Sequence, residues 1–129
     1  MSFHRVFSGA QWEEHVGYCR ALRAGDRVFV TGTAPVNPDG TVHAPRDGYA
    51  QAAHCLSIML EALSGLGAGP EHVTRTRMFV TDIDRWEEFG RAHREVFGEH
   101  PPTTTMVEVR RLIHPDMLIE IEADAVVSD

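Results

Sequence analysis

The sequence predicts an α+β fold in which one mixed sheet carries two helices on the same face. One observation is the order of elements along the 129 residues, which reads strand, strand, helix, strand, helix, strand, strand. The other is an alternation of apolar and acidic residues from Leu118 to Val126. In a strand, such alternation directs one set of side chains to the core and the other to the opposite face. Two helices and about six strands therefore fit a two-layer domain.

The first half of the chain contains a predicted hairpin, a loop and a long helix. Residues 18–22 and 27–33 are the two expected strands, and a glycine-containing turn at 24–26 joins them. Residues 35–46 are rich in turn-forming Asn, Pro, Asp and Gly, which indicates a loop. Apolar residues then recur at helical spacing over 48–66 and stop where glycines follow.

The second half predicts a strand over 73–81, a helix, and two strands that end the chain. Asp82 is the expected N-cap of that helix, and Gly98 ends it. Pro101-Pro102 then favours an extended entry into the last two strands. The predicted apolar stripe of the helix comprises Ile83, Trp86, Phe89, Val96 and Phe97.

The face of the sheet without helices is predicted to be a mosaic of charges. Arg75 and Arg77 share a side of one strand, as do Glu108 and Arg110 on another. Both sets are expected to reach the acidic side of the last strand across neighbouring strands. That acidic side comprises Glu120, Glu122 and Asp124. On the penultimate strand, Thr103, Thr105, Val107 and Val109 are expected to face the helices. Two interpretations remain open: a solvated face with weak ion pairs, or a face that packs against copies of this chain.

Composition limits the class of protein. A formal net charge of −7 argues against nucleic acid and anionic membranes as partners, because both need a basic surface. The two cysteines are too few for a disulfide framework, and no apolar segment suits a signal peptide or membrane span. We therefore expect a single cytoplasmic domain over 1–129. The eight histidines lack metal-ligand spacing, so neither a metal nor a cofactor is expected.

Four segments resemble the Rid family (reactive intermediate/imine deaminase, also called YjgF or endoribonuclease L-PSP). They are Val16-Gly17-Tyr18, Thr31-Gly32-Thr33-Ala34-Pro35, TRMFVTD over 76–82, and the terminal MVEVRRL…IEIEADAVV. They occur in the family's order and spacing along almost the whole chain. The resemblance implies a chorismate-mutase-like fold and a homotrimer with small-molecule clefts between its subunits.

The resemblance also implies a site. Family members with deaminase activity hydrolyse 2-imino or enamine acids to 2-keto acids and ammonia, using a glutamate that positions water and an arginine that binds the substrate carboxylate. The glutamate matches Glu120, whereas Thr104 occupies the place of the arginine. The substrate-binding positions implied by the match are Tyr18, Gly32, Thr104, Thr105 and Met106.

Threonine at position 104 changes what the site can bind. It offers one neutral hydrogen bond in place of an arginine fork, and hydrogen bonds to charged groups contribute roughly 1.5–3 kcal/mol. An atypical substrate is therefore expected. Arg91 is a candidate for a replacement cation, with Arg20 and His93 as alternatives that spacing does not separate.

Three functions are compatible with these residues. The first is an imine deaminase-like hydrolase, and the second is a ligand-binding or regulatory trimer that does no chemistry. The third is a ribonuclease, the least favoured of the three because the chain is acidic and lacks a basic, aromatic groove.

Overall fold

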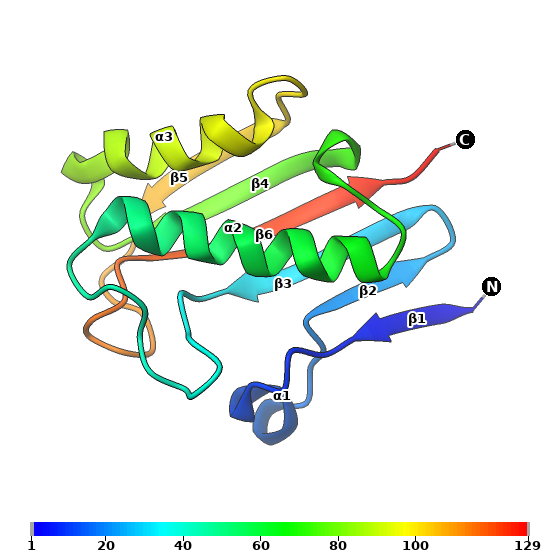
Figure 1. Cartoon of the computed structure of the whole chain (residues 1–129), viewed down its shortest axis with the longest axis horizontal. Coiled ribbons are helices and arrows are strands. Elements are labelled where there is room, and N and C mark those ends of the chain that lie inside the picture. Colours follow the sequence, from blue (N-terminus) through cyan, green and yellow to red (C-terminus); the bar gives the residue numbers. More distant parts are fainter. Residues whose placement is uncertain (1, 129) are drawn as a thin grey trace.

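The computed structural model describes residues 2–128, and its six strands form one sheet in the order β1-β2-β3-β6-β4-β5. The strands are β1 (Phe3–Val6), β2 (Ala21–Ala24), β3 (Arg27–Thr33), β4 (Val73–Val80), β5 (Thr103–Glu108) and β6 (Ile119–Val126). β4 and β5 run parallel, and the other four pairings are antiparallel. Helices α2 (Gly48–Gly65) and α3 (Trp86–Phe97) cover the same face (Figure 1). The predicted α+β class is confirmed.

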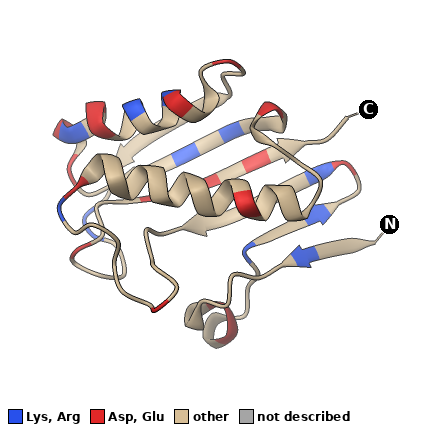
Figure 2. Ribbon diagram, viewed as in Figure 1, with Lys and Arg blue, Asp and Glu red and all other residues tan. Residues whose placement is uncertain are grey.

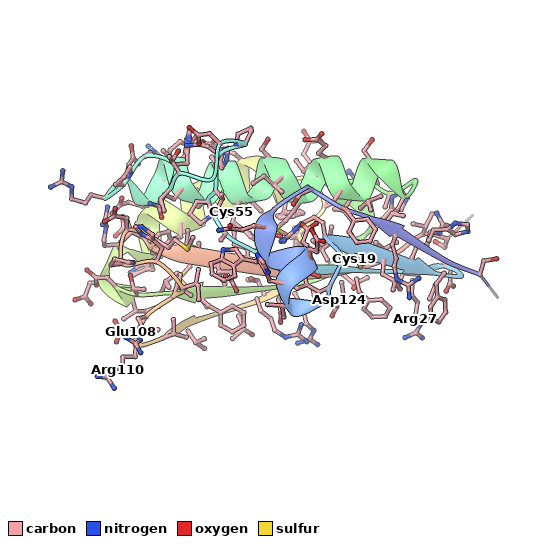
Figure 3. The ribbon with its side chains drawn as sticks, turned by 90° about the horizontal axis from the view of Figure 1, so that it is seen from below. Cys19, Arg27, Cys55, Glu108, Arg110 and Asp124 are labelled. Carbon is pink, nitrogen blue, oxygen red and sulfur yellow. The ribbon has the colours of Figure 1, made fainter. Side chains whose placement is uncertain are left out.

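The core lies between the two long helices and the sheet. Leu56, Met59 and Leu63 of α2 are at most 1 % exposed, as are Ile119 and Ile121 of β6. Figure 3 shows both helices on one side of the sheet, with Cys55 lying between α2 and the strands. The alternation along β6 thus separates core from outer face as predicted, because every second residue of that strand contacts the helix layer.

The ends of the helices follow ordinary capping chemistry with one departure. Asp47 precedes α2 and accepts a hydrogen bond from Ala50 N at 2.9 Å. Asp82, predicted to cap the second helix, instead caps the short 3₁₀ turn η2 (Ile83–Arg85), and α3 begins only at Trp86. The tighter turn changes the phase of the helix. Trp86 is consequently 55 % exposed and not part of the predicted apolar stripe, whereas Phe89 is buried.

The hairpin forms later in the sequence than predicted. β2 covers Ala21–Ala24, not 18–22, and Gly25-Asp26 makes the turn into β3. Two short N-terminal elements, β1 and the helix α1 (Gln11–Val16), were not predicted from the sequence. Both are mostly exposed, so neither shows the apolar periodicity that marks longer elements.

The predicted orientation of β5 was wrong. In the parallel register Thr104 lies beside Thr76, which is fully buried under α3. Thr104 and Met106 therefore face the helix layer, and Thr103 and Thr105 face the opposite side with Val107. Four of the first five residues of β5 are Thr or Val, so the sequence carries no polarity contrast that could fix the orientation.

No helix among the described residues is long and apolar enough to cross a membrane. A further short 3₁₀ turn, η1 (Pro70–His72), leads into β4.

Candidate functional site

Glu120 and Gly32 meet at an irregularity between β3 and β6. The pairing runs from Val30 opposite Ala123 to Thr33 opposite Ile121, so β3 uses one more residue than β6 over this stretch. This β-bulge turns Gly32 toward the neighbouring strand. A Cβ on Gly32 would lie 2.7 Å from Oε2 of Glu120, closer than two such atoms can approach. Only glycine lets the carboxylate lie against the backbone here.

The Glu120 carboxyl is partly buried and has an altered acidity. Burial raises its pKa above the ordinary carboxyl value; the charge of Arg20 opposes that rise and the charge of Glu122 adds to it. Within residues 2–128, no group donates a hydrogen bond to this carboxylate. A carboxylate that is partly desolvated and not occupied by a partner can accept a proton from a bound water molecule.

Arg20 forms a buried ion pair beside the bulge. Its Nη2 lies 3.1 Å from Oε2 of Glu13, and the two side chains are 7 % and 4 % exposed. Its Nη1 donates to the carbonyl oxygen of Gly32 at 2.9 Å and to Oγ1 of Thr33 at 3.3 Å. Glu13 also accepts from the backbone N–H of Ser8 at 3.0 Å. Helix α1 thus supplies the acid that holds Arg20 against the backbone of Gly32.

Tyr18 lies next to this ion pair. Its ring is partly buried, and the guanidinium carbon of Arg20 lies 5.6 Å from the ring centre. Cys19 is also partly buried, and its carbonyl accepts from Thr31 Oγ1 at 2.7 Å. The sequence predicted Tyr18, Gly32 and Glu120 as site residues but did not predict a role for Glu13. No local pattern marks Glu13, because its partner is seven residues away through a helix and a turn.

Thr104 belongs to a second cluster. Its hydroxyl oxygen lies 2.7 Å from that of Thr76, which lies 2.8 Å from Nε2 of His93 on α3. Thr76 pairs with Ala123 while Glu120 pairs with Phe79, three residues further along β4 and on the other face. At about 3.3 Å per residue this is roughly 10 Å along the strand. One chain therefore does not bring Thr104 and Glu120 together.

The remaining predicted site residues lie away from Glu120 as well. Thr105 is exposed on the outer face of β5, and Met106 packs against the core. Arg91 is exposed on α3, where its guanidinium carbon lies 3.9 Å above the ring of Tyr49. Of the cations considered from sequence, the structure brings Arg20 close to Glu120, and Arg91 remains on the helix layer.

The outer face carries the predicted charge pairing in part. Nη1 of Arg77 lies 3.3 Å from Glu122 and 3.5 Å from Asp124, and Arg75 is directly opposite Asp124 in the register. Figure 2 shows the basic residues of β4 alongside the acidic residues of β6. Glu108, in contrast, accepts a hydrogen bond from Ile83 N and does not reach β6.

Metal-binding residues do not gather in the part of the chain that the structure describes. Over 2–128, no group of three or more His, Cys, Asp and Glu is placed to hold an ion. His43 and His54 stack with ring centres 4.1 Å apart, but each ring also hydrogen-bonds a protein oxygen. The chemistry available around Glu120 is therefore that of a carboxylate, an arginine and a backbone bulge.

Comparison with known proteins identifies the family. Residues 10–127 match the family described as Endoribonuclease L-PSP. The crystal structure of Rv2704 from Mycobacterium tuberculosis, a member of the YjgF/YER057c/UK114 family, superimposes with a TM-score of 0.89 at 44 % identity. That similarity covers 98 % of this chain and 100 % of the other. The chain belongs to the endoribonuclease L-PSP family, also known as the YjgF or Rid family.

Two curated relatives have names that specify an activity. The 2-iminobutanoate/2-iminopropanoate deaminase of Escherichia coli is 32 % identical over 112 residues, which cover 84 % of this chain and 86 % of the relative. The 3-aminoacrylate deaminase RutC of Acinetobacter baylyi is 32 % identical over 108 residues, covering 84 % and 85 %. Both names describe removal of an amino or imino nitrogen from a small acid.

Proposed function

We propose that this protein is a hydrolase of imines or enamines whose substrate differs from the usual small imino acids at the group that Thr104 contacts. The observation that carries this proposal is Glu120, a carboxylate with a raised pKa that lies against Gly32 and has no hydrogen-bond donor among residues 2–128. The names of the two curated deaminases support the same reaction class. Thr104 is the reason for an atypical substrate, because it offers a neutral hydrogen bond in place of a charged fork.

The proposed reaction consumes one water molecule. Glu120 accepts a proton from water as the oxygen attacks the imine carbon, and that proton passes to the imine nitrogen to give a carbinolamine. The hydroxyl proton of the carbinolamine then transfers to nitrogen as the C–N bond breaks, which releases ammonia and leaves a carbonyl group. The imine R₂C=NH and water thus give R₂C=O and ammonia. The donors for the developing charge include backbone N–H groups near the bulge, where Gly32 permits close approach. Tyr18 contributes a ring and a hydroxyl at the same end of the sheet.

The proposed active form is a homotrimer of chorismate-mutase-like subunits, with the small-molecule sites between neighbours. Edge strand β5 and the outer face of the sheet are the surfaces that would meet. Phe29 and Val107 on that face are 45 % and 42 % exposed, and their burial between subunits would stabilise such an assembly. In this arrangement Thr104 of one copy would approach Glu120 of the next, although the two lie on opposite faces of one chain.

The alternative is a trimer that binds a ligand in the same cleft and does no chemistry. Thr104 favours this alternative, since a threonine binds a substrate carboxylate less strongly than an arginine does and orients the substrate less well for catalysis. A ribonuclease is the least favoured proposal, because the net charge of −7 opposes binding of a polyanion.

The deciding experiment generates imines in situ from a panel of acidic, neutral and bulky amino acids and amines, and traps what remains. We expect the protein to accelerate imine loss, Glu120→Ala to abolish the acceleration, and Thr104→Arg to shift preference toward imines of small amino acids. Stoichiometric ligand binding without turnover would support the binding-protein alternative. Acceleration that persists in Glu120→Ala would remove Glu120 from the mechanism.

A further inference from the structure

Thr104, Thr76 and His93 form a hydrogen-bonded line from the surface into the protein. Thr104 is exposed on edge strand β5, Thr76 is 0 % exposed on β4, and His93 is partly buried on α3. The successive distances are 2.7 Å between the hydroxyl oxygens and 2.8 Å from Thr76 Oγ1 to Nε2 of His93. Burial excludes water from Thr76, so its one proton must serve one of these two neighbours.

The position of that proton determines what Thr104 offers to a ligand. When Nε2 of His93 carries a proton, it donates to Thr76, Thr76 donates to Thr104, and the Thr104 hydroxyl donates outward. When Nε2 has no proton, Thr76 donates to it, Thr104 donates to Thr76, and the outward lone pair of Thr104 accepts. Neutral His93 allows both arrangements through its two tautomers, whereas protonated His93 allows only the first.

We propose that this Thr104–Thr76–His93 relay is the specificity determinant of the sheet edge. The relay selects a ligand with an uncharged, hydrogen-bonding group such as a carboxamide or hydroxyl at the position where an imino acid has its carboxylate. This inference rests on the proposed function, because it specifies the substrate class of that site. Thr104 is the contact residue, and His93 is a positioning residue that acts through Thr76. Thr76 and Thr104 keep their O–H bonds, and their hydroxyl groups only rotate between the two arrangements. The one bond that forms or breaks is an N–H bond of the His93 ring, when the ring gains or loses a proton or changes tautomer.

The surroundings of His93 favour its neutral form. Burial lowers its pKa below the ordinary imidazole value, and its ring packs against Phe97 with centres 4.7 Å apart. Arg75 and Arg77 flank Thr76 along β4, but their side chains lie on the opposite face of the sheet. The residues beside these three on β5 are Thr103, Thr104 and Thr105, which carry no charge.

Several other charged groups near α3 have partners of their own. Glu71 and His72 of η1 lie 3.5 Å from one another, and on α3 itself Arg91 lies over Tyr49 of α2, whose hydroxyl contacts Glu95. Among residues 2–128, no carboxylate is therefore paired with His93 to hold it protonated near neutral pH.

The test compares pyruvamide with pyruvate, two product-like ligands of equal size that carry a carboxamide or a carboxylate. Calorimetric titration from pH 8 to pH 5 should show the protein binding pyruvamide more tightly at pH 8, by roughly three- to tenfold, the value of one neutral hydrogen bond. As pH falls and His93 is protonated, Thr104 loses its acceptor arrangement. Pyruvamide affinity relative to pyruvate should then decrease, because a Thr104 hydroxyl that only donates suits a carboxylate oxygen as well as a carboxamide oxygen.

Four variants separate the relay from a merely structural role. His93→Gln keeps a hydrogen-bonding side chain that does not titrate, so it should remove the pH dependence of pyruvamide binding. Thr104→Val should remove the preference for pyruvamide, and Thr104→Ser should retain it. Thr103→Val is the matched control on the outer face of the same strand and should change neither property, since its hydroxyl donates to Thr74 O.

A second readout needs no ligand. In protein with ¹⁵N-labelled histidine, the His93 Nε2 resonance should respond to Thr104→Val and not to Thr103→Val. Loss of that response, tighter binding of pyruvate at every pH, or binding of neither compound would overturn the proposal. Imine turnover without a carboxamide preference would reject the relay and leave the proposed function. Carboxamide preference without any turnover would support the relay and reject the proposed function.

Discussion

At the scale of single residues, Glu120 shows how a partly buried carboxylate conflicts with stability. A solvated face would let its charge be hydrated, yet its carboxyl lies against Gly32 and is partly withdrawn from water. Desolvation disfavours the charged form, which is the form that a general base needs. A position chosen for stability alone would carry an uncharged side chain.

Glu120→Gln is therefore expected to raise the Tm by a few degrees at neutral pH. The folded-state pKa of Glu120 lies above its unfolded value, so the wild type loses stability as pH rises through the folded pKa. Glutamine does not ionise, and the Tm difference should grow between pH 4 and pH 8. Calorimetry over that range measures it. A Tm of Glu120→Gln below that of wild type at pH 8 would mean that the charge is stabilised by a partner.

The pH profile of turnover follows from the same carboxyl. Because Glu120 must be ionised to accept a proton, kcat/KM for imine hydrolysis should rise with pH through a pKa above that of an ordinary glutamate. Initial rates with trapped products, measured from pH 4 to pH 8, test this. A rate that is flat across this range would indicate that another group controls the step.

At the scale of elements, the bulge between β3 and β6 places Glu120 beside Gly32. Gly32→Ala introduces a Cβ 2.7 Å from Oε2 of Glu120, so the carboxylate must move. We expect turnover to fall at least about tenfold, since a displacement near 1 Å costs on the order of a hundredfold in rate. The fold should persist by circular dichroism. Gly90→Ala on α3 is the matched control, because its nearest heavy atom would lie 4.0 Å away.

The double variant tests whether the contact itself is responsible. If the alanine acts by displacing the carboxylate, then Gly32→Ala should lower the Tm less when Glu120 is already alanine. Equal losses in both backgrounds would attribute the effect to backbone strain in the bulge.

Helix α1 is short and exposed, but its Glu13 completes a buried ion pair with Arg20. Glu13→Gln leaves the arginine charge buried without its counter-ion, which should cost about 3 kcal/mol of unfolding free energy. Glu14→Gln, an exposed neighbour on the same helix, should cost less than about 0.5 kcal/mol. Urea unfolding of both variants gives the comparison. A loss for Glu13→Gln as small as that for Glu14→Gln would show that α1 readily opens to hydrate Arg20.

The elements differ in how well the sequence predicts them, for physical reasons. α2, β4 and β6 bury one whole face, and their apolar spacing identified them. β5 is an edge strand that begins with three threonines, a methionine and a valine, so its two faces show little contrast in polarity, and its predicted orientation was wrong. The site divides in the same way. Glu120 follows from strand alternation and family resemblance, whereas Glu13 and the Thr76–His93 contact depend on tertiary packing between distant residues.

At the scale of the whole molecule, the outer face of the sheet has no covering layer of helices among residues 2–128. It combines the Arg77 pairs to Glu122 and Asp124 with exposed Phe29 and Val107. Figure 3 shows Arg27 and Asp124 on this side of the sheet, opposite the helices. Exposed ion pairs stabilise a monomer by about 0–1 kcal/mol each, so the stability of a monomer gives little reason for these charges. It gives no reason for the exposed apolar residues among them. Burial of this face in the proposed trimer would explain both.

Arg77→Glu should therefore weaken the proposed trimer. The new carboxylate would lie within reach of Glu122 and Asp124, and in an assembly three copies of this acidic cluster would face one another. Light scattering at several protein concentrations should give a mass near three times 14.4 kDa for the wild type and a lower, concentration-dependent mass for Arg77→Glu. Arg94→Glu, which changes the net charge equally on the exposed side of α3, should remain trimeric. A wild-type mass of 14.4 kDa would mean that this face is solvated and that Glu120 must act without a neighbouring subunit. An unchanged trimer in Arg77→Glu would mean that this face is solvated and that the subunits meet through another surface.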